Sequence, residues 1–104
     1  MMVLVVEDDP SQRALLIHVL ERMGFATAEA ESIEEARQVE RADLIIADWQ
    51  LGEHTAEELH TGVPMIVLSG YSKPEHWTGI WLEKPIDLAD LRKKVAKAIA
   101  EAGL

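Results

Sequence analysis

Four short apolar runs along the chain each end at polar or charged residues. In chain order they are 3–6, which leads into Glu7, Asp8 and Asp9; 44–47, which leads into Asp48; 65–68, which leads into Ser69; and 80–82, which leads into Glu83 and Lys84. An all-apolar run of this length is typical of a strand buried on both faces of a sheet. In open α/β folds the carboxyl ends of parallel strands carry the chemistry. We therefore predict that Asp48 ends a central strand and that the other polar groups gather around it.

Segments with helical periodicity and capping residues separate these strands. Helices are predicted over about 10–23, between Asp9 as cap and Gly24 as stop; from a capping box at Ser32 and Glu35 to about residue 41; and over 88–102, between Asp87 as cap and Gly103 as stop. A weaker alternation over 25–30 predicts a further strand. Strands that alternate with helices in this way indicate a parallel sheet with right-handed crossovers.

Two stretches depart from this regular alternation. Thr55 and Glu58 form a third capping box, but Gly62 and Pro64 limit the helix that follows to about two turns. The segment 70–79 contains two glycines and a proline, which leave no room for a crossover helix of ordinary length. We expect an irregular loop there, with one helical turn at most.

Length and composition limit the remaining possibilities. The 104 residues suit one domain, expected to span 1–104, and because the chain ends at Leu104 we expect no attached output domain. The net charge of -9 disfavours nucleic acid and anionic membranes as partners. The absence of cysteine excludes disulfides and thiolate zinc sites. No segment has the length and apolarity of a signal peptide or a membrane span, so a cytoplasmic location is expected.

The acidic residues at the predicted sheet edge suggest a metal site beside a nucleophile. Glu7, Asp8 and Asp48 would place three carboxylates in one crevice, where their mutual repulsion favours a bound cation and their hard oxygen atoms suit Mg²⁺. A carboxylate such as that of Asp48 can accept a phosphoryl group as an acyl phosphate. Lys84 and the Ser69 hydroxyl would then neutralise and hydrogen-bond the transferred group.

Four sequence motifs resemble those of response-regulator receiver domains, the phosphoacceptor domains of two-component signalling. They are VLVVEDDP, LIIADWQL, PMIVLSG and LEKPID, and they follow the family's order over the whole chain. The resemblance implies a flavodoxin-like (CheY-like) α/β fold of three layers, with a five-stranded parallel sheet in the order 2-1-3-4-5. In this chain the third helix is expected to be shortened and the fourth to be short or absent. Ser69, Gly70 and Tyr71 resemble a subclass of receivers whose fourth helix is poorly ordered.

The resemblance also implies a role for each site residue. Asp48 would be phosphorylated; Asp8 would bind Mg²⁺ directly and Glu7 through water; Asp48 and the backbone carbonyl of Gln50 would complete the protein's metal ligands; Ser69 and Lys84 would contact the phosphoryl group; and Trp81 would be the aromatic residue that turns inward with Ser69 on activation. The peptide bond between Lys84 and Pro85 would be cis.

The resemblance implies partners as well as residues. The donor would be a phosphohistidine on a sensor histidine kinase or on a histidine phosphotransfer protein, and the downstream partner would be a protein that the sequence does not identify. The chain would catalyse only its own phosphoryl transfer and dephosphorylation, and would not be an enzyme with an external substrate.

Two other functions fit parts of the sequence. A receiver-like binding module that acts without phosphorylation fits the shortened helices. A small hydrolase that uses Asp48 on external phosphoesters is a second alternative, but Gln50 stands two residues after Asp48, where a general acid would be needed. Trp77, Trp81 and Tyr71 also fit a hydrophobic cover for a sheet face that a missing helix leaves bare.

Overall fold

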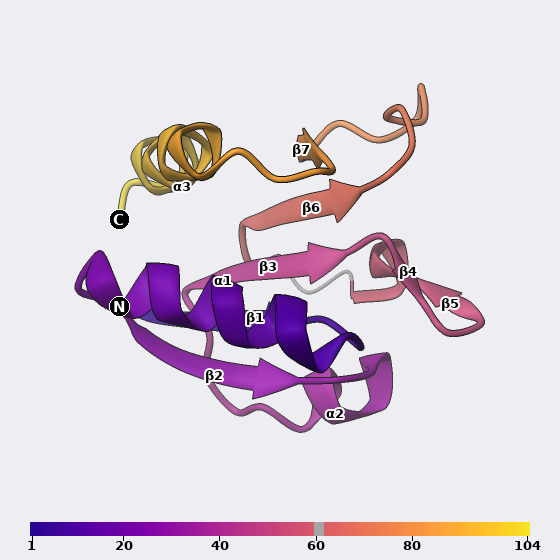
Figure 1. The fold of residues 1–104 in the computed structure, drawn as a ribbon, viewed down its shortest axis with the longest axis horizontal. Helices are drawn as coiled ribbons and strands as arrows, with labels where there is room; N and C mark the ends of the chain where they lie inside the picture. Colours follow the sequence, from indigo (N-terminus) through magenta and orange to yellow (C-terminus); the bar gives the residue numbers. More distant parts are fainter. Residues whose placement is uncertain (60–61) are drawn as a thin grey trace.

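The computed structural model describes residues 1–59 and 62–104. Five parallel strands form its main sheet: β1 (Met2–Val6), β2 (Ala26–Ala30), β3 (Leu44–Asp48), β6 (Met65–Ser69) and β7 (Ile80–Glu83). Their order across the sheet is β2-β1-β3-β6-β7 (Figure 1). When only these strands are numbered, the order is 2-1-3-4-5, so the predicted flavodoxin-like topology is confirmed.

Helices on both faces of the sheet produce three layers. One face is covered by α1 (Pro10–Arg22) and α3 (Leu88–Ala102), and the other by α2 (Ile33–Arg37) and the 3₁₀ helix η1 (Ala56–Leu59) (Figure 1). Successive side chains of a strand point to opposite faces. In β1, Val3 and Val5 therefore join the core under α1 and α3, while Leu4 and Val6 join the core on the other face. Burial on both faces explains why the strand runs contain no polar residue.

The predicted caps of α1 and α3 are present. The Asp9 carboxylate accepts hydrogen bonds from the N–H groups of Ser11 (2.9 Å) and Gln12 (3.3 Å) at the start of α1. At the start of α3, the Asp87 carboxylate accepts from Ala89 (2.9 Å) and Asp90 (3.4 Å). These side chains satisfy N–H groups that have no partner within the helix. Gly103 ends α3 at a φ of 72°, a left-handed conformation that glycine adopts without steric cost.

α2 is shorter than predicted, because it ends at Arg37 instead of near residue 41. Ser32 caps it as expected and accepts a hydrogen bond from the Glu35 N–H (3.1 Å). After Arg37 the chain leaves the helix, and Val39 and Ala42 pack against the core on this face. Residues 38–42 are mostly good helix formers, so the packing of the partly buried Val39 and Ala42 outweighs the local helical propensity here.

The prediction of a helix of about two turns after Thr55 is wrong for the described residues. The chain instead forms a hairpin of β4 (Gln50–Leu51) and β5 (His54–Thr55), followed by the single turn η1; residues 60–61 of the predicted helix lie outside the described part. The Glu58 carboxylate does accept the Thr55 N–H (3.0 Å), as a capping box requires. The Ala56 N–H, however, donates to the Trp49 carbonyl (2.8 Å), and Ala56 is fully buried. This contact and the burial of Ala56 hold the segment against the sheet edge, and the described part of the helix is the single turn η1.

The segment 70–79 contains no helix, which confirms the predicted irregular loop. Three tryptophans pack on the sheet face beside it. The ring centroid of Trp49 lies 5.6 Å from that of Trp77 and 5.2 Å from that of Trp81, and all three rings contact the core on the α2 side. A side chain at Gly79 would meet the Trp77 indole at 2.9 Å, so this packing requires glycine there. The aromatic cover expected for a missing helix is thus present for Trp77 and Trp81, but the expectation is wrong for Tyr71, which is 77% exposed.

Within residues 1–59 and 62–104, none of the helices combines the length and the apolar character needed to cross a membrane.

Candidate functional site

The acidic residues of the site lie at one edge of the sheet. Asp48 is the last residue of β3, and Glu7 and Asp8 directly follow β1, its neighbour in the sheet. The arrowheads of the neighbouring strands point to this edge in Figure 1, where the β4–β5 hairpin also lies. One carboxylate oxygen from each of the three residues lies within 4.8 Å of the others. Parallel pairing therefore brings together the three acids that the sequence predicted to meet.

Most polar atoms of Glu7 form hydrogen bonds with neighbouring residues. Its N–H donates to the Ala30 carbonyl (3.0 Å), its carbonyl accepts from Arg13 Nη1 (2.8 Å), and its Oε1 accepts the Asp9 N–H (3.1 Å). The residue is 1% exposed. Its Oε2 is buried and accepts no hydrogen bond from the described residues, with Lys84 Nζ 3.6 Å away. A buried carboxylate oxygen without a hydrogen bond is costly unless a cation completes its surroundings.

Asp48 lies deep in the site and is paired with Lys84. Its side chain is 14% exposed, and its Oδ1 lies 3.3 Å from Lys84 Nζ. Burial raises the pKa of Asp48, and the nearby Asp8 charge adds to this, whereas Lys84 acts in the opposite direction. Burial is also the main cause that raises the pKa of Glu7, with the Asp9 N–H acting against it. Both carboxylates therefore carry their negative charge at a cost in folding free energy.

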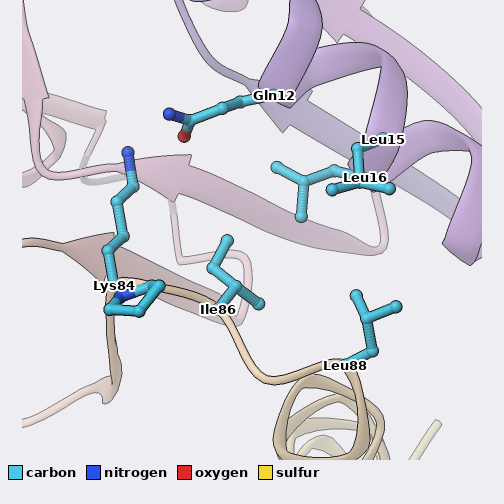
Figure 2. Close-up of a pocket in the computed structure, with 7 residues that line it drawn as sticks. Gln12, Leu15, Leu16, Lys84, Ile86 and Leu88 are labelled. Carbon is cyan, nitrogen blue, oxygen red and sulfur yellow. The ribbon is translucent and has the colours of Figure 1, made fainter.

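Lys84 reaches this edge from the strand beyond β6. Its backbone N–H donates to the Ser69 carbonyl (2.7 Å), which continues the pairing of β6 with β7 by one residue. The peptide bond between Lys84 and Pro85 is cis, as predicted. The side chain then extends toward the amide of Gln12 on α1 (Figure 2).

A cavity of about 440 Å³ lies between α1 and the segment that leads into α3 (Figure 2). Its lining is mostly apolar and comprises Gln12, Leu15, Leu16, Lys84, Pro85, Ile86 and Leu88. Lys84 is shared between the cavity and the acidic cluster, whereas Asp48, Glu7 and Asp8 do not line the cavity. The cavity is thus a neighbour of the acidic site and not a pocket around Asp48.

Ser69 and Trp81 are connected through the backbone of Tyr71. The buried Ser69 Oγ accepts the Tyr71 N–H (3.1 Å), and the Tyr71 carbonyl accepts the Trp81 Nε1–H (3.0 Å). The Trp81 ring also packs on Trp49, the residue after Asp48. The pair predicted as a switch is therefore coupled to the start of the 70–79 loop. The sequence did not reveal this link, because it depends on where the loop backbone runs.

Gln50 lies two residues beyond Asp48, in strand β4. Its side-chain amide donates to the carbonyls of Gly52 (2.7 Å) and His54 (3.3 Å), which stabilises the hairpin. The metal contact predicted for Gln50 concerns its backbone carbonyl and stays a prediction.

Arg13 is a site residue that the sequence analysis missed. It lies in the second turn of α1 and contacts both the Glu7 carbonyl and the Glu29 carboxylate. The sequence signal that could have pointed to Arg13 is its spacing from the cap residue Asp9. Arg13 follows Asp9 by one helical turn and therefore lies above the acidic loop.

Comparison with known families agrees with the fold and the cluster. Residues 3–96 match the model of the response regulator receiver domain. The chain is a receiver domain of the response-regulator family.

The chain is similar to a response regulator and to the receiver domains of two histidine kinases. It is 31% identical over 115 residues to the response regulator protein PilR of Pseudomonas aeruginosa, covering 92% of this chain and 25% of PilR. The chain thus spans about a quarter of the length of that relative. The receiver domain of the hybrid histidine kinase CckA matches with a TM-score of 0.80 and 25% identity, over 95% of this chain and 99% of that one. The signal receiver domain of a signal transduction histidine kinase from Syntrophus aciditrophicus matches with a TM-score of 0.84 and 27% identity, over 96% and 90%.

Proposed function

We propose that this receiver domain accepts a phosphoryl group on Asp48 from a phosphohistidine, with Mg²⁺ bound, and changes its protein partners as a result. The donor would be a sensor histidine kinase or a histidine phosphotransfer protein. The observation that carries the proposal is the position of Asp48, which lies beside one ammonium group and within a cluster of three carboxylates. We place this activity in the cytoplasm, where the donor would be phosphorylated.

The charges of the cluster suit a divalent cation. Three carboxylates and one ammonium leave two negative charges when all are ionised. Hard carboxylate oxygens are the ligands that Mg²⁺ prefers, and Glu7 Oε2 lacks a hydrogen-bond donor among the described residues. Glu7, Asp8, Asp48 and the Gln50 carbonyl are the proposed ligands. A bound Mg²⁺ would neutralise the cluster and stabilise negative charge on the phosphoryl oxygens.

The protein groups have distinct parts in the transfer. An Asp48 carboxylate oxygen attacks phosphorus, the bond from phosphorus to the donor imidazole nitrogen breaks, and its electron pair stays on that nitrogen. Lys84 Nζ, now 3.3 Å from Asp48 Oδ1, is placed to pair with a phosphoryl oxygen. The Ser69 oxygen accepts from Tyr71, and its O–H, which has no acceptor among the described residues, can donate to a phosphoryl oxygen. A Ser69 hydroxyl drawn toward the phosphoryl group would disturb the Tyr71 backbone and, through it, Trp81.

A phosphorylation-independent binding module is the second candidate function. The absence of a helix over 70–79 and the single turn of η1 favour it, because both features reshape a surface beside the site. A module of this kind has no need of a working metal site. Mg²⁺ binding is therefore the property that separates the two functions.

The hydrolase alternative gains no support. The 440 Å³ cavity is lined by Lys84 but not by Asp48. Gln50, at the position where a second acid would be needed, has its side chain engaged with Gly52 and His54. We propose that the domain acts only on its own phosphoryl group.

The test uses Trp49, which directly follows Asp48. Mg²⁺ would be titrated while tryptophan fluorescence is followed, and a small acyl-phosphate donor would then be added and intact mass measured. We expect saturable quenching and a phosphorylated species. Asp48→Ala should lose both responses, while Glu83→Ala, which removes an exposed acid next to Lys84, should keep them.

The outcomes distinguish the candidates. Phosphate retained on Asp48→Ala would contradict the assignment of the acceptor. A folded wild-type protein that responds neither to Mg²⁺ nor to the donor would favour the binding module. Steady turnover of a generic phosphoester would revive the hydrolase.

A further inference from the structure

We propose that Arg13 is a positioning residue for the acidic loop, which it fixes so that Asp8 faces Asp48. This inference rests on the Mg²⁺ site proposed above. It assigns to Arg13 a role in metal affinity, although the guanidinium itself is a cation and does not bind metal.

Arg13 bridges three elements. From α1, its Nη1 donates to the Glu7 carbonyl at 2.8 Å, and its Nε lies 3.1 Å from Glu29 Oε1 on β2. The Arg13 side chain is 16% exposed, whereas that of Glu29 is 60% exposed. A guanidinium is planar, so two bonds made through different nitrogen atoms fix its orientation. Glu29 thus orients the guanidinium, and the guanidinium holds the Glu7 carbonyl.

The Glu7 carbonyl controls the direction in which the chain continues. The peptide unit between Glu7 and Asp8 is planar, so fixing its oxygen also fixes the N–H and Cα of Asp8. Asp8 is exposed, unlike Glu7, and packing does little to hold it. The N–H and Oε1 of Glu7 are held by Ala30 and Asp9 and not by Arg13. Arg13 is therefore the side chain that restrains the peptide leading to the proposed direct metal ligand.

Charge and position predict opposite effects when Arg13 is replaced. If Arg13 acted only as a nearby cation, its removal would strengthen Mg²⁺ binding, because less positive charge would repel the metal. If it positions Asp8, its removal weakens Mg²⁺ binding, because the ligand must be ordered during binding. The exposed ion pair with Glu29 adds little by itself.

The experiment compares Mg²⁺ dissociation constants, measured by calorimetry at fixed ionic strength, for the wild type and three variants. Arg13→Met, which keeps the length of the side chain without its donors, should weaken binding by roughly 10- to 100-fold, the range found when groups that orient metal ligands are removed. Arg13→Lys keeps the charge but lacks the fork and should also weaken binding. Glu29→Gln keeps an acceptor for Nε and should stay close to the wild type.

Hydrogen exchange at the Asp9 N–H, which donates to Glu7 Oε1 in the same loop, gives a second measurement in metal-free protein. The exchange should be faster in Arg13→Met and Arg13→Lys than in Glu29→Gln, with folding of each variant checked by circular dichroism. If Arg13→Met does not fold, Arg13→Lys decides by the same two measurements. Unchanged or tighter Mg²⁺ binding in a folded Arg13 variant would overturn the inference while leaving the proposed function intact. No Mg²⁺ binding in the wild type would overturn both.

Discussion

Lys84 Nζ, from the residue that directly follows β7, lies 3.3 Å from Oδ1 of Asp48 at the end of β3. The same ammonium is 3.6 Å from Glu7 Oε2, so it partly neutralises two buried acids at once. It reduces the cost of burying these charges and also repels any second cation that enters the cluster.

Replacing Lys84 by Met should separate metal binding from phosphoryl transfer. Loss of the ammonium removes a competing cation, so Mg²⁺ should bind several-fold more tightly. Phosphorylation by an acyl-phosphate donor should slow by roughly 100-fold, the usual cost of losing one group that stabilises transition-state charge. Calorimetry and intact-mass time courses measure the two effects. Lys93→Met, on the exposed side of α3, should change neither, and weaker Mg²⁺ binding in Lys84→Met would contradict the account.

Asp48→Asn should stabilise the metal-free protein near neutral pH. Burial raises the pKa of Asp48, so the folded state holds its proton more tightly than the unfolded chain does. For a carboxyl group with a raised pKa, the free energy of unfolding rises as the pH falls from above the folded-state pKa toward the ordinary value of 3.8. Asn removes this cost and should therefore raise the free energy of unfolding of the metal-free protein at neutral pH.

Urea denaturation measures this effect across pH. The stability advantage of Asp48→Asn should shrink as the pH falls, and it should also shrink in saturating Mg²⁺, which stabilises only the wild type. Glu21→Gln makes the same chemical change on the exposed side of α1 and should show neither trend. A less stable Asp48→Asn protein in metal-free neutral buffer would show that burial is not the dominant influence on Asp48.

Trp81→Phe should break the hydrogen bond that links residue 81 to the Tyr71 backbone and, through it, to Ser69. Phe keeps an aromatic ring near Trp49 but cannot donate to the Tyr71 carbonyl, so stability should fall by about 0.5–1.5 kcal/mol. Hydrogen exchange at the Tyr71 N–H should become faster, because the loop loses one of its two anchors. Ser69→Ala should have the same effect on this amide, whereas Trp77→Phe should not. Unchanged exchange in Trp81→Phe would mean that the Tyr71 link carries no signal.

His54, in the β4–β5 hairpin, should make the free energy of unfolding depend on pH. Its Nδ1 lies 2.9 Å from Glu58 Oε1, and this contact raises the pKa of His54 above 6.5. The hydrogen bond from the Thr55 N–H is the main cause that lowers the pKa of Glu58 below 4.5, and the hydrogen bond with His54 is the second cause. The His54 contribution is complete below pH 6.5 and is lost as the pH rises through the folded-state pKa; the Glu58 contribution is present above pH 4.5 and is lost as the pH falls through its own lowered pKa.

Urea midpoints from about pH 5 to about pH 8 test this pair. The wild type should lose stability over the upper part of this range, and His54→Gln should lose less. His18→Gln, on the exposed side of α1, is the matched control and should follow the wild type. Identical pH profiles for His54→Gln and the wild type would mean that the contact contributes nothing in solution.

The sequence by itself determined the main sheet, the capped ends of α1 and α3 and the identity of the clustered acids. These features depend on short-range rules: apolar runs become buried strands, and Asp9 and Asp87 satisfy N–H groups two and three residues away. Because parallel strands share one carboxyl edge, the meeting of Glu7 and Asp8 with Asp48 followed from the strand assignment. The irregular loop followed from glycine and proline alone.

Only the tertiary structure decided the features that depend on contacts between distant segments. Thr55 and Glu58 carry a helix signal, yet the described part of this segment is a hairpin followed by the single turn η1, with Ala56 buried and bonded to Trp49. The roles of Arg13 and Tyr71 were likewise hidden, because each uses backbone groups whose positions no local pattern specifies. Local propensity amounts to a few tenths of a kcal/mol per residue, whereas each buried methylene-sized group contributes about 0.8 kcal/mol, so packing prevails where the two disagree.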